Sequence, residues 1–147
     1  MLFACDADGM RIRLRIDRYQ SPAKHEYGDW WCDCGYSFQM GKFLCYEAES
    51  VEILTPEDVD YLSQKLSDLL SGKITENEEA SFPEPDFAFK FYPKTPETDI
   101  SLEWIVNFWD RGALTANFLT ITLDRDKIEL LNNFLCDCIR RDGERGA

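Results

Sequence analysis

Hydrophobic and polar residues alternate along several stretches of this chain, which is the pattern of a half-buried β-strand. In residues 10–17 every even position is apolar and every odd position is charged. The same alternation continues over residues 30–40, where the even positions are apolar or aromatic, from Trp30 to Met40. A turn at Gly41 then leads into residues 43–54. The first half of the chain is therefore predicted to form three strands.

The second half repeats this scheme. Phenylalanines alternate over residues 87–91 in a strand that stops at Pro93, and apolar residues alternate again over residues 100–108. The stretch 110–112 predicts a turn, and the alternating apolar residues of 119–123 predict the last strand. Three further strands are expected here.

Each half ends in a predicted amphipathic helix. Thr55 is a good N-cap, Pro56 suits the first helical position and Gly72 is a typical stop. Asp124 is the expected cap of the second helix. The two apolar stripes match at an offset of 69 residues. They comprise Val59, Leu62, Leu66, Leu69 and Leu70 in the first helix, and Ile128, Leu131, Phe134, Leu135 and Cys138 in the second.

These elements predict an α+β fold with antiparallel sheet of about six strands and two helices, in the order βββα-βββα. At 147 residues the chain fits one domain, 1–147. Residues 1–72 and 73–140 form a possible pseudo-repeat, and a charged tail, 141–147, is expected to fray. The polar segment 73–86 is predicted to run over the surface.

The charge of the chain limits its partners. There are 28 acidic and 16 basic residues, which gives a net charge of -12 and a pI of about 4.4. Nucleic acid and anionic membranes are polyanionic, so neither is an expected partner, whereas a basic protein is. General acidity of a cytosolic protein explains the charge equally well. Because the segment from Met1 to Asp6 has no basic region or long apolar run, no leader is predicted. No membrane span is predicted either, since the longest apolar stretches are far shorter than the about 20 residues that a spanning helix needs. The expected location is cytoplasmic, with reduced cysteines.

Two C-D-C triplets, at residues 32–34 and 136–138, raise the question of a zinc site. Residues two apart share a face on a strand but lie far around a helix from each other. Since Cys138 belongs to the apolar stripe, Cys136 should point away from it. The cysteines are therefore interpreted as small core residues, and no metal is predicted.

Catalytic groups are sparse. His25 is the only histidine and lies in a predicted loop, which excludes the common zinc sites built on several histidines. Glu47 and Glu49 share one strand face and could act as acid and base, but a solvated outer face explains them equally well. No glycine-rich nucleotide-binding motif is present. No enzyme activity, catalytic residue or cofactor is predicted.

Acidic and aromatic residues instead suggest an interaction surface. Trp31 and Trp109 should point away from the core, as interface anchors do, unless a helix covers them. An acidic stretch from the first helix to residue 86 can steer a basic partner, although it can also be a solvated helix face and linker. The candidate partner-binding residues are Glu57, Asp58, Glu76, Glu78, Glu79, Glu84, Trp31 and Trp109.

Three segments carry a family resemblance. They are Glu49–Leu54, which leads to the first helix, Ile100–Trp104, and Leu114–Ile121, which leads to the last helix. With the order of elements, they resemble the WapI-type immunity proteins of bacterial contact-dependent toxin systems, over roughly residues 10–139. The resemblance implies a small, acidic, cytoplasmic protein that binds a cognate toxin domain and blocks it. It implies no catalytic residues.

The sequence therefore predicts a non-enzymatic binding protein, monomeric or homodimeric, that neutralises a basic toxin domain such as a nuclease. Two alternatives stay open. One is a small enzyme or ligand-binding domain with a cleft between sheet and helices, using His25 and the face of Glu47 and Glu49. The other is a structural homodimer formed through a sheet edge or the exposed tryptophans.

Overall fold

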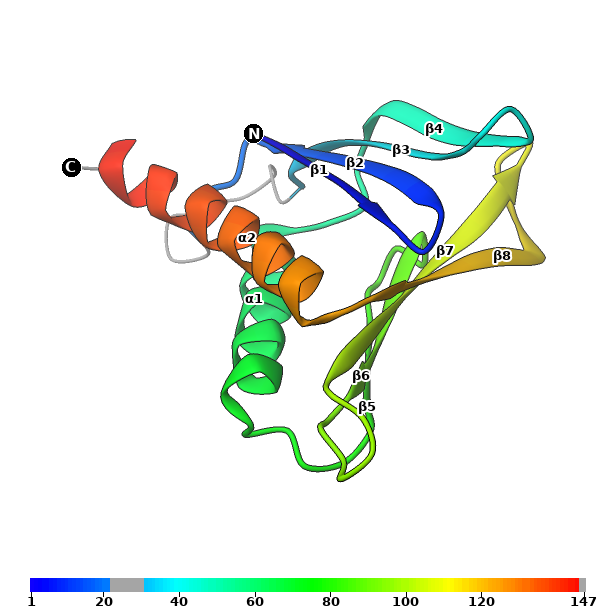
Figure 1. The fold of residues 1–147 in the computed structure, drawn as a ribbon. Coiled ribbons are helices and arrows are strands. Elements are labelled where there is room, and N and C mark those ends of the chain that lie inside the picture. The colour runs from blue at the N-terminus through cyan, green and yellow to red at the C-terminus, as the bar shows by residue number, and fades with distance from the viewer. Residues whose placement is uncertain (22–30, 146–147) are drawn as a thin grey trace.

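The computed structural model describes residues 1–21 and 31–145, with side-chain detail as far as residue 142. It contains two antiparallel four-stranded sheets and two helices (Figure 1). The first sheet comprises β1 (Leu2–Ala7), β2 (Met10–Asp17), β3 (Asp33–Met40) and β4 (Leu44–Val51), and is followed by α1 (Pro56–Ser71). The second sheet comprises β5 (Glu78–Ser81), β6 (Phe87–Tyr92), β7 (Ser101–Asp110) and β8 (Ala113–Leu123), and is followed by α2 (Arg125–Arg145).

Both sheets are simple meanders, in which each strand pairs with the next one along the chain. The α+β class and the antiparallel pairing are confirmed, but the prediction of about six strands is wrong, because β1 and β5 were missed. The order is ββββα-ββββα. β5 lies within the segment predicted as a surface linker, where Ile74, Ala80 and Phe82 are buried.

The two missed strands are both at sheet edges. Within residues 1–21 and 31–145, β1 pairs with β2 alone, and β5 pairs with β6 alone. β5 has four residues and a single buried apolar side chain, Ala80, so it is too short to show a period of two. Pairing with a neighbouring strand, rather than its own pattern, places it in the sheet.

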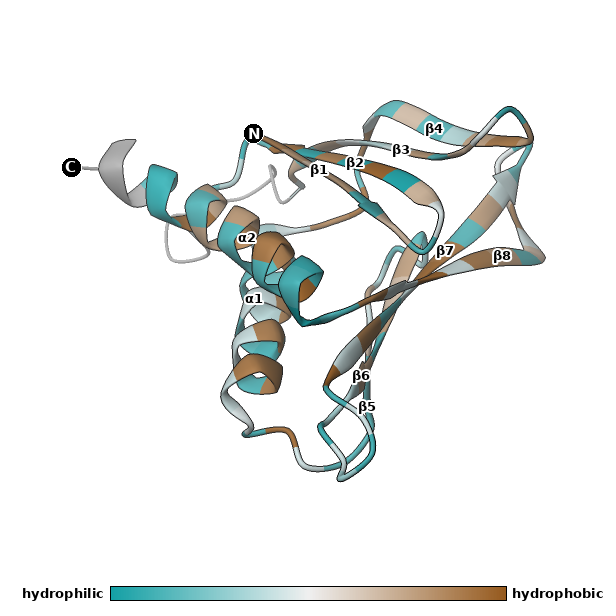
Figure 2. Cartoon of the chain, viewed as in Figure 1, coloured by the Kyte–Doolittle hydropathy of each residue, from teal (hydrophilic) through white to brown (hydrophobic). Residues whose placement is uncertain are grey.

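The core lies between the inner faces of the two sheets and the two helices. Phe38 of the first sheet contacts Phe87 and Trp104 of the second in edge-to-face geometry, with ring centroids 5.9 and 5.4 Å apart. Phe134 of α2 packs on Phe3 of β1 at 5.7 Å. Both helices carry hydrophobic and hydrophilic residues on different sides (Figure 2). The buried apolar side chains form one continuous cluster.

The helix ends follow the sequence closely. The Thr55 side chain accepts a hydrogen bond from the Asp58 N–H, and the Asp58 side chain accepts one from the Thr55 N–H, which makes a capping box. Gly72 ends α1 in the left-handed conformation, with φ of 83°. Asp124 accepts a hydrogen bond from the Lys127 N–H, as expected of a cap. α2 continues to Arg145, so the segment predicted as a tail begins inside the helix.

The two helices pack against each other through a polar contact as well as their apolar stripes. Asn132 of α2 is buried, and its side chain accepts a hydrogen bond from Ser63 and donates one to Ser67, both on α1. These bonds satisfy a buried amide and fix the register of one helix on the other.

Candidate functional site

The predicted acidic surface falls into two groups at opposite ends of α1. Glu57 and Asp58 lie in the first turn, where Asp58 is held in the capping box and Glu57 is exposed. Glu76 follows the other end of the helix and is exposed. A helix of 16 residues is about 24 Å long, so the structure does not bring the two groups together.

The acidic residues in and after β5 differ in how far they are already paired. Glu78 forms an ion pair with Lys65 of α1, which fastens β5 to the helix. Glu79 is exposed, and its carboxylate lies 3.8 Å from the Lys90 ammonium, a weak surface pair. Glu84 is half-buried. Of this group, Glu76 and Glu79 are the exposed carboxylates.

The two candidate tryptophans are both half-buried. The Trp109 side chain lies close enough to the Asp86 carboxylate to lower its pKa, against the larger effect of burial. His25 and Trp30, which the sequence singled out, lie outside the described residues.

A buried polar cluster joins the two sheets beside Trp109. The Asp86 side chain is only 5% exposed, and the Tyr36 hydroxyl lies 3.5 Å from it. The Tyr46 hydroxyl accepts the Trp109 N–H at 3.2 Å, and the Asn107 side chain donates to a backbone carbonyl at 2.6 Å. Burial raises the pKa of Asp86 above its ordinary value. Asp86 and Tyr36, at the centre of the cluster, are buried, so the cluster is interpreted as serving the junction between the sheets rather than a substrate.

Sequence reasoning missed this cluster. Its members come from β3, β4, β7 and the segment before β6, so no spacing along the chain links them. The one local signal is Asp86 itself, a carboxylate directly before the strongly apolar strand β6.

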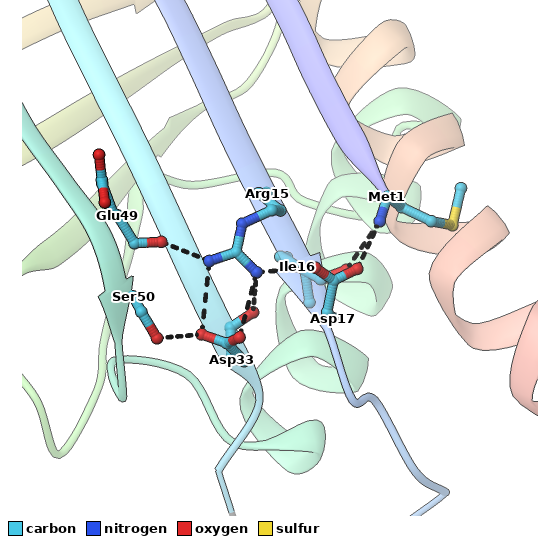
Figure 3. Close-up of polar contacts among 7 residues, drawn as sticks. All are labelled: Met1, Arg15, Ile16, Asp17, Asp33, Glu49 and Ser50. Carbon is cyan, nitrogen blue, oxygen red and sulfur yellow. Dashed lines mark hydrogen bonds and ion pairs between the residues drawn. The ribbon is translucent and has the colours of Figure 1, made fainter.

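A second polar network lies on the outer face of the first sheet (Figure 3). Arg15 donates to the Asp17 carboxylate at 2.7 Å, pairs with Asp33 at 3.3 Å and donates to the carbonyl of Glu49. Ser50 donates to Asp33 at 2.7 Å. The pKa of Asp33 is lowered, first by the Ser50 hydrogen bond and then by Arg15. The Met1 amino group binds the other side of Asp17, also at 2.7 Å.

This network closes a β-bulge between β3 and β4. The register shifts between Cys34 and Tyr36, where Gly35 faces an irregular stretch of β4. A Cβ on Gly35 would lie 2.6 Å from the Glu49 carbonyl oxygen and 3.1 Å from the Arg15 guanidinium. The absence of a side chain at residue 35 therefore lets Arg15 reach across the strand.

Glu47 and Glu49 lie on this same outer face, on the other side of the sheet from the helices. Beside them is an open hollow of about 360 Å³, whose lining includes Arg13, Arg15, Gly35 and Glu49. The two glutamates therefore do not enter a cleft between sheet and helices, as the enzyme alternative required. Arg15 is already matched by two carboxylates, so its own guanidinium has little charge to offer a ligand.

The four cysteines of the C-D-C triplets lie where the sequence predicts, three in the core and Cys136 pointing away from it. Cys32, Cys34 and Cys138 are buried, whereas Cys136 is exposed on the other side of α2. Burial raises the pKa of the Cys34 thiol to about 12 and that of Cys138 to about 11, so both stay protonated and unreactive near neutral pH. Among the described residues no three histidine, cysteine or acidic side chains are grouped to hold a metal ion.

Exposed apolar side chains gather on two hairpins, a feature that sequence reasoning also missed. Phe43, at the β3–β4 turn, is 96% exposed, and Phe118 and Leu114 of β8 are 58% and 46% exposed. The hairpins touch where the rings of Tyr46 and Phe108 pack with centroids 4.7 Å apart. Clusters of exposed apolar side chains are typical of protein-binding surfaces.

Comparison with known families identifies the group to which this fold belongs. A family model described as the immunity protein WapI-like family matches residues 2–141, which include every strand and most of α2. The chain belongs to the WapI-like immunity protein family. The resemblance noted in the sequence is thereby confirmed, and the family match supports a toxin-immunity role in general. No curated protein and no solved structure matches the chain.

An immunity protein acts on a toxin partner, so the relevant sites in a WapI-like protein are binding surfaces rather than cavities. The described helices include none long and apolar enough to span a membrane. The available surfaces are the two acidic groups around α1 and the exposed apolar residues of the two hairpins.

Proposed function

We propose that this WapI-like protein is a non-enzymatic inhibitor that binds a basic toxin domain, such as a nuclease, and blocks it. The observation that carries the proposal is the family match over residues 2–141 in a chain with a net charge of -12. A domain that handles nucleic acid needs a basic surface, and an acidic inhibitor can compete for that surface with the polyanionic substrate.

The described side chains support binding better than catalysis. The buried thiols stay protonated, Asp86 is sealed between the sheets, and Arg15 is neutralised by Asp17 and Asp33. The exposed carboxylates of Glu76 and Glu79 can bind a partner's lysines and arginines, because the pairing of Glu79 with Lys90 is weak. Charged groups at the rim of an interface mainly accelerate association.

The first experiment is protection in bacteria. The toxin domain encoded beside the gene for this chain is expressed with and without the chain, and growth is followed. The proposal expects growth only when both are present, and a complex when the purified proteins are mixed. Failure of this chain to protect against any neighbouring toxin domain would remove the proposed function.

A charge-reversal pair tests whether the acidic group after α1 takes part. Glu76→Lys with Glu79→Lys should slow association with the toxin domain about tenfold, an effect that high salt reduces. The matched control is Glu97→Lys with Glu129→Lys, because both residues are exposed and the net charge changes by the same amount. Equal association rates for the two double variants would exclude a specific role for Glu76 and Glu79.

A further inference from the structure

β8 is the outermost strand of the second sheet, so one of its edges has no neighbouring strand among the residues that the structure describes. The Thr122 N–H points to that edge, because it donates to the Asp8 carboxylate at 3.2 Å. The N–H of Asn107, the residue opposite Phe118, is directed away from β8 and donates to the Asp86 carbonyl. Alternate residues of a strand direct both backbone groups to the same side. Phe118 and Thr120 therefore present their N–H and C=O groups to the open edge.

This edge lacks the usual protection against pairing. From Gly112 to Leu123 the chain has no charged residue and no proline, although natural proteins commonly use both to block exposed edges. Asp8 covers the edge at Thr122, and a bulge near Trp109 bends the outer end of the hairpin. Between these two points, Phe118 and Thr120 stay in regular pairing with β7, and the Phe118 ring is 58% exposed.

We propose that the free edge of β8 accepts an extended strand of the toxin domain, so that the second sheet continues into the partner. This inference rests on the proposed function and names the surface that performs it. Main-chain hydrogen bonds to Phe118 and Thr120 supply the pairing, and apolar side chains of the incoming strand cover the Phe118 ring.

Charge favours a basic strand over a second copy of this chain. The uncharged part of β8 ends at two acidic groups: Asp8 lies at the edge beside Thr122, and Asp124 follows the strand. Lysine or arginine at the matching end of the incoming strand complements the charge of these two carboxylates. Two copies that each carry a net charge of -12 repel one another as they approach.

The test uses the toxin domain against which the chain protects in co-expression. In Thr120→Pro an edge-facing N–H is removed, a change that edge strands tolerate because no ladder bond is lost. In Phe118→Thr the exposed ring is removed but strand preference is kept. The control is Leu130→Gln, since Leu130 is a 48% exposed apolar residue on α2. Thermal melts establish that all three variants fold.

Both β8 variants should bind the toxin domain at least about tenfold more weakly than the wild type, and the control should bind equally well. In hydrogen exchange, the amides of Phe118 and Thr120 should exchange rapidly in the free protein and become protected in the complex. In addition, the wild type and both β8 variants are each sedimented without the toxin domain over a range of concentrations, to measure whether they form dimers.

The outcomes separate the two levels of the proposal. If the wild type binds no toxin domain, the proposed function is wrong and the edge proposal falls with it. If the wild type binds and both β8 variants bind equally well without new amide protection, only the edge proposal is wrong. If the wild type alone forms a dimer that both variants dissociate, the occupant is a second copy, which overturns the assignment to a basic strand.

Discussion

The Tyr36 hydroxyl of β3 lies 3.5 Å from a carboxylate oxygen of Asp86, and this contact connects the two sheets inside a buried region. Burial raises the pKa of Asp86, and this effect outweighs that of the Trp109 side chain, which lowers the pKa. The folded protein therefore favours the protonated form of this carboxyl group more than the unfolded chain does.

The raised pKa of Asp86 predicts a pH-dependent difference between the wild type and Asp86→Asn. The contribution of the neutral carboxyl is fully present below its unfolded pKa of about 4 and is lost as the pH rises through the folded pKa. The wild type should therefore lose stability relative to Asp86→Asn as the pH rises from about 4 to 7. Urea unfolding of both proteins across this range measures the difference. The account is contradicted if the difference in unfolding free energy between the two proteins does not change with pH, or if the wild type loses stability relative to Asp86→Asn as the pH falls.

Gly35→Ala should destabilise the protein. The new Cβ would lie 2.6 Å from the Glu49 carbonyl oxygen, which is backbone and cannot simply swing away. Relieving this overlap requires a shift of the bulge and of Arg15, at a cost of about 1–3 kcal/mol in the free energy of unfolding. The control is Ser37→Ala, one position along the same face of β3. Equal stability of the two variants in urea would show that the bulge has room for a side chain.

Asp99 and Arg125 form a bidentate ion pair at the start of α2, with distances of 2.7 and 2.9 Å. The pair lowers the pKa of Asp99 to about 2. In Arg125→Gln the pKa of Asp99 should rise towards its ordinary value, which an NMR titration of the carboxyl carbon detects. Stability linked to this group is present above the unfolded pKa and is lost as the pH falls towards 2. An unchanged titration in the variant would show that Arg125 is not the cause.

Five of the six cysteines should fall into two classes of reactivity towards alkylating reagents. Cys45 and Cys136 are exposed, whereas Cys32, Cys34 and Cys138 are buried. Iodoacetamide should modify the exposed pair in the native protein and reach the buried three only after unfolding. Peptide mass spectrometry reads the sites directly. Modification of Cys34 in the native state at the rate of Cys45 would contradict the assigned burial.

Much of the fold follows from residues that act locally. Thr55, Asp58 and Gly72 fix the ends of α1 through bonds to their near neighbours, so the sequence predicts them well. The alternation in β2 works because one face meets the core and the other meets water. These features depend on positions a few residues apart, which a single sequence displays.

The features that were missed depend on distant parts of the chain. β5 is a strand because β6 lies beside it, and Lys65 and Glu78 meet only after α1 has packed next to β5. The Asp86 cluster draws on four segments, and the exposure of Phe118 follows from the edge position of β8. An alternating pattern identifies a strand, but it does not say whether that strand has a neighbour on both sides.

If this WapI-like protein inhibits a toxin domain by binding it, a titration of the toxin domain will show an equimolar end point. A fixed amount of the active toxin domain, well above the dissociation constant, is mixed with increasing amounts of the protein, and the remaining activity is measured. The account predicts a linear fall to zero activity at equal amounts of the two proteins. Complete inactivation by far less than an equal amount would indicate catalytic turnover, and undiminished activity with the protein in excess would exclude inhibition.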